Sequence, residues 1–340
     1  MLERPFFSVI LVNYNSGDYI SRALQSLKDQ SFRDFEVIIM DNGSEDGSAE
    51  FDDLTGLPDV EVVKLGENLG FAAANNQAAE RARGKWLALL NPDTIASPNW
   101  LQELAAASAR NPSCRSFASA QYRLGNRGEL DGAGDAYHLF GFPWRGGFGH
   151  SSSELPEEGY CFSACGAAAM YDRDVFLAYN GFDERFFCYC EDVDLGFRLR
   201  IGGESCIFVP SAVIDHEGSG ISGRTSAFSL YHGTRNRLWT FAKCMPLGLK
   251  IALFPIHLGL SLYVLVRHLF VHKEAAGWRG LVDGLKGLPA LSRTKRWDPP
   301  RRKVSIRELT QCMAWNPVRL SQRKPHVQPL AIAENVILAV

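Results

Sequence analysis

The sequence predicts an α/β fold built on a doubly wound, mostly parallel sheet. Apolar, β-branched runs at residues 6–12, 35–40 and 86–90 are almost uninterrupted, as in parallel strands that are buried on both faces. Segments with helical spacing of apolar residues lie between these runs, and each of the three runs is followed by a polar segment. Strands and helices that alternate in this way are typical of doubly wound sheets.

The elements follow one another regularly up to residue 97. We expect strands at 6–12, 35–40, 60–65 and 86–90, and helices at 19–30, 48–54 and 69–82. The segment 122–153 is rich in glycine and aromatic residues, so we predict a long loop or irregular hairpin of the kind that often borders a site. Further on we expect strand-like structure at 160–171, a helix at 192–200 and a short strand at 206–210.

Composition places the chain among globular proteins. Its 340 residues allow one large α/β domain plus an appendage. A hydrophobic fraction of 46% and a charged fraction of 22% exclude a disordered chain. The net charge of -2 gives no sign of a nucleic-acid partner. The 8 cysteines form no CxxC pair, and no signal peptide is expected. We therefore predict reduced thiols in the cytoplasm. A disulfide between two clustered cysteines is the alternative.

Ligands of open α/β sheets bind beyond the carboxyl ends of the strands. Three polar segments follow predicted strands, at 13–17, 41–47 and 91–94. Asp41 can accept hydrogen bonds from a base or a ribose, and Asp93 can share a divalent cation with phosphates. A helix N-cap in the second segment and an Asx-turn in the third are the structural alternatives.

A third acidic region lies at 181–200, where four acidic residues bracket an aromatic run. Glu191 and Asp192 open the predicted helix, and Arg198 and Arg200 close it, which complements the helix dipole. The dipole does not explain the aromatic residues beside Glu191 and Asp192. A carboxylate next to apolar surface is suited to act as a general base.

Five motifs occur in a fixed order along the chain. They are SVILVNYN at 8–15, DNGS at 41–44, NLGFAAANN at 68–76, LNPD at 90–93 and FFCYCEDVDL at 186–195. Together they resemble family 2 glycosyltransferases of the GT-A fold, in the branch that includes bacterial rhamnosyltransferases, over roughly residues 6–245. The resemblance implies transfer of a sugar, with inversion, from a nucleoside-diphosphate sugar (UDP- or dTDP-linked) to an acceptor hydroxyl.

The resemblance also implies roles for single residues. Asp192 would be the catalytic base, supported by Glu191, and Asp194 and Tyr189 would lie on the acceptor side. Asp93 and His216 would bind Mg²⁺ or Mn²⁺. Many relatives have a second Asp in the metal motif, but position 91 is Asn here, so His216 is the candidate for the further ligand. A locally hydrogen-bonded loop histidine is the alternative. The residues implied to bind the donor are Asn13, Asn15, Asp41, Asn68, Gly70, Asn76, Asn91 and Arg235.

The C-terminal region, 246–340, is predicted to be an apolar and basic helical extension of a catalytic domain at 1–245. Residues 247–271 are strongly apolar but interrupted by Lys250, Pro255, His257 and Arg267. We therefore expect an interfacial or re-entrant helix rather than a spanning one, followed by basic residues suited to an anionic membrane leaflet. Peripheral attachment to the inner face of the plasma membrane would suit a lipid-linked or glycan acceptor. A core or dimer helix with a solvated basic tail is the alternative.

Three other functions are disfavoured. A sugar nucleotidyltransferase would carry a glycine-rich loop with a basic residue after the first strand, and a dehydrogenase would carry GxGxxG there; residues 13–17 have neither. A catalytically inactive scaffold that binds sugar nucleotides is disfavoured because Asp41, Asp93 and Asp192 are all present. The sugar, the base, the acceptor linkage and the oligomeric state stay open.

Overall fold

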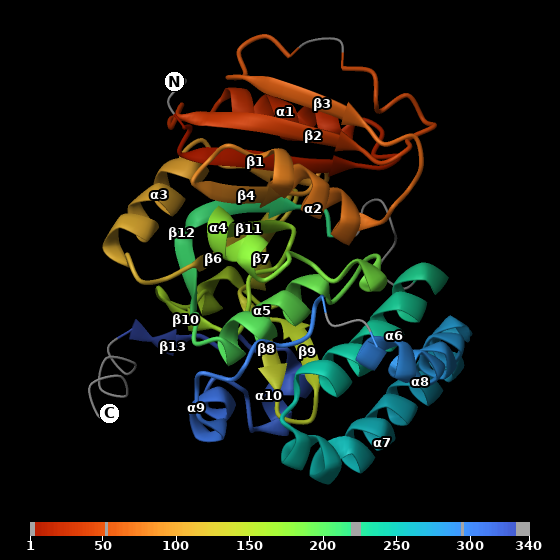
Figure 1. The fold of residues 1–340 in the computed structure, drawn as a ribbon. Helices are drawn as coiled ribbons and strands as arrows, with labels where there is room; N and C mark the ends of the chain where they lie inside the picture. Colours follow the sequence, from red (N-terminus) through yellow and green to blue (C-terminus); the bar gives the residue numbers. More distant parts are fainter. Residues whose placement is uncertain (1–3, 52–53, 219–225, 294–295, 331–340) are drawn as a thin grey trace.

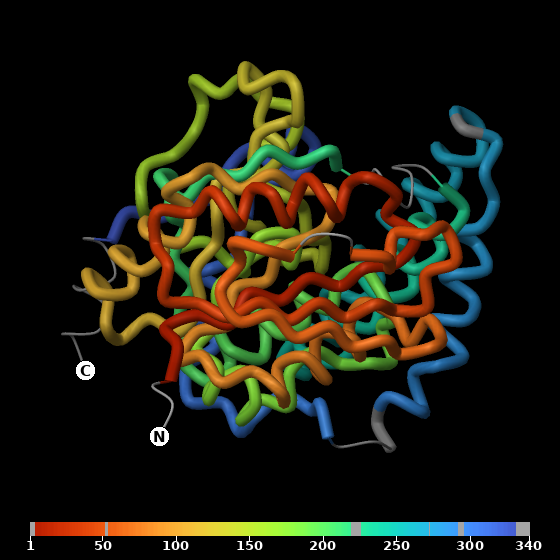
Figure 2. Tube along the Cα trace, turned by 90° about the horizontal axis from the view of Figure 1, so that it is seen from above, coloured from red at the N-terminus to blue at the C-terminus, as the bar shows by residue number. Residues whose placement is uncertain are grey.

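The computed structural model describes residues 4–51, 54–218, 226–293 and 296–330 (Figure 1). Its main sheet has the strand order β13-β10-β12-β6-β11-β4-β1-β2-β3. Helices lie on both faces of this sheet, and a cluster of C-terminal helices packs at one side, as both views show (Figures 1 and 2). All eight cysteines are free thiols, so the alternative of a disulfide is wrong.

The N-terminal part is the parallel half of the sheet, as predicted. Strand β1 (Phe7–Asn13) pairs in parallel with β2 (Phe35–Asp41) and with β4 (Trp86–Leu90), and β2 pairs in parallel with β3 (Val60–Lys64). Every residue of β1, β2 and β4 is buried, which explains their uninterrupted apolar sequences. Helices α1 (Tyr19–Lys28) and α2 (Phe71–Arg81) connect these strands.

The predicted helix at 48–54 is wrong for the residues that the structure describes there. Residues 48–51 and 54 form turns and irregular chain. Gly47, with φ +84°, adopts a left-handed conformation just before them, and the side chain of Ser48 bonds to the loop after β1 instead of capping a helix.

The second half of the sheet is mixed rather than mostly parallel. Strand β11 (Ala168–Asp172) runs antiparallel to both β4 and β6 (Ser116–Arg123). Strand β12 (Cys206–His216) then pairs in parallel with β6 and antiparallel with β10 (Gly159–Cys161). The predicted strand at 206–210 therefore continues to His216 through a register shift between Val209 and Val213, and 160–171 holds two strands separated by a turn.

The segment 122–153 is more regular than predicted. Strand β7 (Asn126–Ala133) forms a hairpin with β6, and β8 (Asp135–His138) forms a second hairpin with β9 (Phe142–Arg145). A short 3₁₀ turn, η1 (Ser152–Glu154), follows. These hairpins place buried polar residues beside the end of β12, which is where the predicted site lies.

The remaining helices complete the fold. They are α3 (Trp100–Arg110), α4 (Arg173–Ala178), η2 (Glu184–Phe186), α5 (Glu191–Ile201), α6 (Ala227–Cys244), α7 (Leu247–His272), α8 (Ala276–Arg293), α9 (Ile306–Gln311) and α10 (Pro317–Gln322). Helix α8 packs closely on α6 through glycines. A Cβ at Gly280 would meet the carbonyl oxygen of Tyr231, and one at Gly287 would lie 2.6 Å from the ring of Trp239.

Residues beyond 245 also return to the sheet. Ala314 N donates to Tyr137 O at 2.9 Å, and Trp297 Nε1 donates to Asn180 O at 2.8 Å. Strand β13 (Gln328–Pro329) adds to the sheet edge at β10. A domain boundary at 245 stays a prediction, because the described residues after it share contacts with the catalytic part.

Helix α7 runs for 26 residues with Pro255 inside it, and whether it lies in a membrane interface stays a prediction. Its buried face carries His257, Ser261 and Leu265, each at most 2% exposed. Its outward face is apolar, with Ile251 68% and Phe270 79% exposed. Among the described residues, this one helix is long and apolar enough to cross a membrane.

Candidate active site

A cleft of ≈ 260 Å³ opens beyond the carboxyl end of β4, between the loops that precede α5 and the β8–β9 hairpin. It brings together four of the predicted site residues, namely Asn91, Tyr189, Glu191 and Asp192. Further lining residues are Phe71, Asp135, Trp144, Arg145, Cys165, Gly166, Cys188 and Cys190. The cleft is thus acidic at its base, with aromatic and thiol groups around it.

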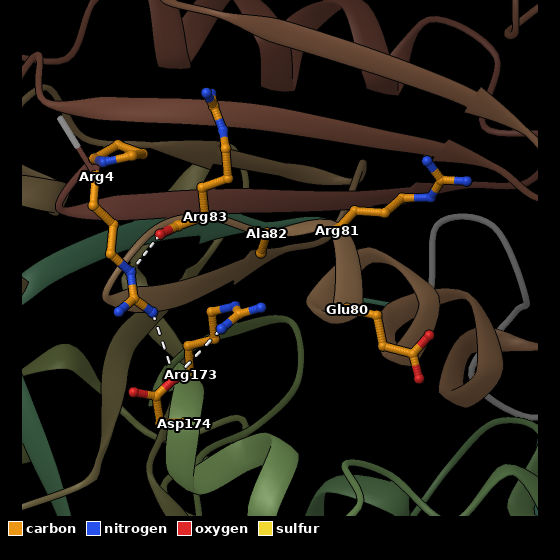
Figure 3. A pocket seen from close by; sticks show the side chains of 8 residues that line it. Arg4, Glu80, Arg81, Ala82, Arg83, Arg173 and Asp174 are labelled. Carbon is orange, nitrogen blue, oxygen red and sulfur yellow. Dashed lines mark hydrogen bonds and ion pairs between the residues drawn. The ribbon is translucent and has the colours of Figure 1, made fainter. Parts of the chain in front are cut away.

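A larger depression of ≈ 520 Å³ lies at the opposite edge of the sheet, where β1 and β4 begin (Figure 3). Its arginines are engaged with the protein: Arg4 Nε donates to Arg83 O at 2.6 Å, and Arg4 Nη2 lies 3.4 Å from Asp174 Oδ1. Ligands of such sheets bind at the carboxyl ends of the strands, so we assign the site to the smaller, acidic cleft.

The predicted nucleotide side forms one polar network at the ends of β1 and β2. Asp41 is 4% exposed, and its Oδ1 accepts from Asn13 Nδ2 at 3.2 Å. Asn13 Nδ2 also lies 3.1 Å from Ser48 Oγ. Exposed Asn15 holds the neighbouring loop, because its Oδ1 accepts from Glu45 N at 2.8 Å. The structure therefore places Asn13 beside Asp41, its partner in the parallel register, and Asn15 in the adjoining loop.

Asn68 and Gly70 shape the turn that leads into α2. Asn68 Oδ1 accepts from Asn42 Nδ2 and from Gly70 N, both at 2.9 Å. Gly70 has φ +86°, and a Cβ there would lie 2.5 Å from the ring of Phe187 and 2.8 Å from its carbonyl oxygen. Only glycine fits this close approach between the α2 turn and the loop before α5.

Asn76 was predicted to bind the donor, but the structure gives it another role. The residue is 6% exposed. Its Nδ2 donates to Phe182 O at 2.8 Å and to Glu184 Oε1 at 3.0 Å, and its Oδ1 accepts from Phe182 N at 2.8 Å. Since both ends of the amide are engaged, Asn76 fastens the loop that precedes α5 and does not offer its side chain to a donor.

His216 and Asp93 meet because of an antiparallel pairing. The short strand β5 (Thr94–Ala96) pairs with the end of β12, and Thr94 lies opposite His216. As a result His216 Nε2 lies 3.4 Å from Asp93 Oδ1, and His216 Nδ1 lies 2.7 Å from Asp131 Oδ2. Arg145 forms an ion pair with Asp131. All of these groups except Arg145 are nearly inaccessible to solvent.

This arrangement fits a divalent cation. Burial lowers the pKa of His216, but the hydrogen bonds to Asp131 and Asp93 more than offset it, so the pKa is raised overall. His216 Nε2 faces the Asp93 carboxylate at 3.4 Å. An imidazole nitrogen and a carboxylate oxygen at this separation can be neighbouring ligands of one ion, and both are common ligands of Mn²⁺, while the carboxylate also suits Mg²⁺.

Asp192 is the carboxylate that is open to the cleft. It lies in the first turn of α5 and is partly exposed. Gly166 N donates to its Oδ2 and Val193 N to its Oδ1, both at 2.8 Å. Burial raises the pKa of Asp192, and these backbone hydrogen bonds and the positive charge of Arg145 partly counteract the rise. The carboxylate can therefore hold a negative charge and still accept a proton.

Asp135 is a second carboxylate beside Asp192, which the sequence analysis missed. Oxygen atoms of the two side chains and Cys165 Sγ all lie within 4.8 Å of one another. Burial and then the charge of Asp192 raise the pKa of Asp135 well above its usual range. Two carboxylates this close are difficult to ionise together, and Asp192 has the backbone donors. We therefore place the charge on Asp192 and a proton on Asp135.

Glu191 is less available than Asp192. It is 4% exposed, and its Oε2 makes no hydrogen bond in the described part of the chain. Burial, followed by the charge of Asp192, raises its pKa well above the usual range. A neutral, buried Glu191 adds no second negative charge to the base of the cleft.

The loop before α5 is held in an unusual conformation. Phe187, Tyr189 and Cys190 all have positive φ, of 66°, 70° and 64°, which costs free energy for residues other than glycine. Asn236 on α6 is fully buried and holds the loop, because its Nδ2 donates to the carbonyl oxygens of Phe186 at 2.9 Å, Cys188 at 2.8 Å and Tyr189 at 2.7 Å. This loop places Tyr189 at the wall of the cleft.

Arg235 and Asp194 are also engaged with other parts of the protein. Arg235 Nη2 donates to Phe186 O at 2.9 Å, and its guanidinium stacks over Trp239 at 4.4 Å, so Arg235 supports the same loop and its contact with a phosphate stays a prediction. Asp194 is fully buried. It pairs with Arg198 at 2.8 Å and with Lys243 at 2.7 Å, so it faces the α5–α6 interface rather than an acceptor.

The residues that were missed lie in the β7–β9 hairpins and the turn before β11. They are Asp131, Asp135, Arg145, Cys165 and Gly166. The only signal in the sequence was the unusual composition of 122–153, which predicted a segment bordering a site without indicating which residues face it.

Known proteins resemble this chain in sequence and in fold. Over 245 residues it is 29% identical to an N-acetylglucosaminyl-diphospho-decaprenol L-rhamnosyltransferase of Mycobacterium tuberculosis. The alignment covers 65% of this chain and 79% of the relative. Its fold resembles Staphylococcus aureus TarS, residues 1–349, in complex with UDP-GlcNAc (TM-score 0.54, 19% identity, 84% and 83% of the two chains). It also resembles a mannosyltransferase from Pyrobaculum calidifontis in complex with GDP-Man and Mn²⁺ (TM-score 0.53, 18% identity, 91% and 79%).

These likenesses confirm the GT-A fold and a glycosyltransferase similar to rhamnosyltransferases. Residues 8–179 match the family model described as glycosyl transferase family 2. Because this match spans just over half of the 340 residues, the chain belongs to glycosyl transferase family 2.

Proposed function

We propose that this glycosyltransferase moves a sugar from a dTDP- or UDP-linked donor to a hydroxyl of a lipid-linked acceptor, with inversion at the anomeric carbon. The observation that carries the proposal is the carboxylate of Asp192. It is open to the cleft, held by two backbone N–H groups, and accompanied by a more deeply buried carboxyl group, Asp135. The lipid-linked acceptor is suggested by the name of the mycobacterial relative.

Asp192 acts as the general base in this proposal. It takes the proton of the acceptor hydroxyl while the oxygen attacks the anomeric carbon from the side opposite the diphosphate. The new glycosidic bond forms as the bond between that carbon and the diphosphate oxygen breaks, and the nucleoside diphosphate leaves with the electron pair. A positioned base of this kind contributes typically ~10²–10⁴-fold to the rate.

The thiols of the cleft do not supply a nucleophile for a covalent intermediate. Burial raises the pKa of Cys165 to about 12 and the pKa of Cys188 well above its usual value. A thiol is nucleophilic as the thiolate, so these cysteines are neutral and unreactive near pH 7. Direct attack by the acceptor oxygen requires no protein nucleophile and gives inversion.

Asp93 and His216 would hold Mg²⁺ or Mn²⁺ next to the donor diphosphate. When bound, the ion would neutralise the charge that develops on the leaving diphosphate. Asp131 orients His216 through the 2.7 Å contact to Nδ1, which leaves Nε2 directed towards Asp93. Second-sphere carboxylates commonly fix a ligating histidine in this way.

The donor's nucleoside would lie along the edge formed by Asn13, Asn15 and Asp41, with Asn68 and Gly70 shaping the adjoining turn. Asn91 follows β4 and lines the cleft together with Asp192. Asp41 offers acceptor oxygens to a base or ribose, and the loop backbone offers donors. This order runs from the nucleoside through the diphosphate to the reacting carbon.

Helix α7 would place the enzyme on the cytoplasmic face of the plasma membrane. Its outward face is apolar, including Tyr263 at 63% exposure, and apolar patches of this kind mark interaction surfaces. Arg296, Arg301, Arg302 and Lys303 are exposed basic residues that suit an anionic leaflet; Lys295 and the side chain of Arg293 lie outside the described residues. Peripheral attachment would bring the cleft to lipid-linked acceptors.

Release of nucleoside diphosphate tests the proposal. Purified full-length protein would be incubated with UDP-, dTDP- and GDP-sugars, with Mg²⁺, Mn²⁺ or EDTA, and with or without a membrane-lipid extract. We expect release from one donor that requires both the lipid extract and a divalent cation. Failure to release or bind any of these donors in the presence of the extract would contradict the proposed activity, and full activity in EDTA would contradict the metal site.

A further inference from the structure

Arg237 on α6 is a cation without a counter-ion in the described part of the chain. Its Nε and Nη2 are buried and make no hydrogen bond, and no described carboxylate pairs with it. Its guanidinium lies over the ring of Phe142, 4.4 Å from the centroid. Burial lowers the pKa of Arg237 to about 10. Burying a charge costs free energy unless an anion compensates it. A negatively charged ligand beside Arg237 would supply this compensation.

Arg237 borders the proposed active site. Phe142, which it covers, directly precedes Pro143, a lining residue of the cleft. Cys190, which also lines the cleft and directly precedes Glu191, interacts electrostatically with Arg237. The guanidinium therefore lies beside residues at the hairpin side of the cleft.

A second unpaired donor lies in the same region. The hydroxyl of Tyr137 on β8 is buried and has no hydrogen-bond partner among the described residues, and it interacts electrostatically with Arg237. Its ring is fixed by stacking on Phe162, with centroids 4.9 Å apart, and by an edge contact to Phe197 at 5.0 Å. A guanidinium and a hydroxyl that both lack acceptors favour an anion with several oxygen atoms.

Arg237 also lies towards α7. His257 on the buried face of α7 feels its charge, stacks on Phe241 at 4.4 Å and contacts Phe140 O at 2.9 Å. The opposite face of α7 is the exposed apolar surface. Arg237 thus stands between the cleft and the proposed membrane surface, whereas the donor diphosphate belongs near Asp93 and His216.

We propose that Arg237, assisted by Tyr137, binds the diphosphate of the lipid-linked acceptor. A lipid-linked sugar presents a hydroxyl, a diphosphate and a hydrocarbon chain in that order, which matches the order Asp192, Arg237 and α7. The planar guanidinium can bind two phosphate oxygens at once. The inference rests on the proposed function in one respect, which is the lipid-linked nature of the acceptor.

Binding of farnesyl diphosphate to the full-length protein in detergent tests the inference, with farnesol and dTDP as the uncharged-lipid and donor-side controls. We expect Arg237→Met to weaken farnesyl diphosphate binding roughly 10- to 100-fold, the effect of losing charge-assisted hydrogen bonds. Farnesol and dTDP affinities should not change. Tyr137→Phe removes a hydroxyl that has no partner among the described residues. It should weaken the binding of farnesyl diphosphate a few-fold without lowering the melting temperature.

The controls separate the possible errors. If both variants bind farnesyl diphosphate as the wild type does, the subsite is wrong. If Arg237→Met weakens the binding of dTDP as much as that of farnesyl diphosphate, the arginine binds the donor. If it weakens the binding of farnesol as much as that of farnesyl diphosphate, its role is structural. Absence of any donor turnover by the wild type would refute the proposed function alone, because the binding comparison needs no catalysis.

Discussion

Replacing each member of the carboxylate pair in turn should separate their roles. Oxygen atoms of Asp135 and Asp192 lie within 4.8 Å, so two charges there would repel by about 3 kcal/mol at an effective dielectric constant of 20. One proton on the pair relieves this repulsion. Each backbone N–H that donates to Asp192 favours the anion by ~1.5–3 kcal/mol, so the charge belongs on Asp192 and the proton on Asp135.

Asp192→Asn should therefore lower kcat by about 10²–10⁴-fold, the contribution of a general base. Asp135→Asn substitutes an amide for a neutral carboxyl of the same shape, and we expect less than about a tenfold loss, or 1.4 kcal/mol. Both variants would be assayed for nucleoside diphosphate release at saturating donor and acceptor, with melting temperatures as a folding control. An equal loss in both variants, or a larger one in Asp135→Asn, would refute this assignment of the base.

Three further predictions concern the loop, the buried acid and α7. Gly70→Ala should destabilise the protein more than Gly66→Ala. Both glycines have positive φ, but only a Cβ at position 70 would meet the loop before α5, at 2.5 Å. Gly66→Ala should cost ~1–2 kcal/mol of folding free energy, and equal melting temperatures of the two variants would contradict the close approach. Burial raises the pKa of Glu191, so the folded protein loses stability as pH rises from the unfolded value near 4.3 through the raised one. Glu191→Gln should therefore gain melting temperature relative to the wild type at pH 8 and gain less at pH 5; the same difference at both values would argue against a buried neutral acid. Tyr263→Asn combined with Phe270→Asn should reduce flotation with anionic liposomes by several-fold while leaving the melting temperature unchanged, and undiminished flotation would count against α7 as the membrane surface.

The parts of the fold that depend on local sequence were predictable. Strands β1, β2 and β4 are buried on both faces, and their apolar runs show this directly. Asp41 follows from the same rule, because it ends a parallel strand. The position of Asp192 in the cleft was predictable from its place at the start of a helix beside an aromatic segment.

The second carboxylate was not predictable, because it depends on pairing between distant strands. Asp135 reaches Asp192 only through the β8–β9 hairpin and the turn at Gly166. Asp131 meets His216 because β6 pairs with both β7 and β12. The sequence of 122–153 shows flexible and aromatic residues but contains no periodicity that reports this register.

Asn76, Arg235 and Asp194 have partners within the protein that the sequence did not indicate, for a common reason. A polar side chain in a motif can serve a ligand or satisfy buried groups of the protein itself. Asn76 and Arg235 bind backbone groups of the loop before α5, and Asp194 neutralises Arg198 and Lys243. Their partners are up to 108 residues distant in the chain, so only the tertiary structure distinguishes the two roles.

The configuration of the reaction product tests the central claim, a single displacement at the donor carbon with Asp192 as base. The donor that supports nucleoside diphosphate release, with dTDP-L-rhamnose tested first, would be incubated with a lipid-diphosphate sugar acceptor, and the anomeric configuration of the new glycoside would be determined by NMR. We expect inversion, so that a β-linked donor yields an α-linked glycoside. A product that keeps the configuration of the donor would contradict direct attack and would require a covalent intermediate or a different mechanism.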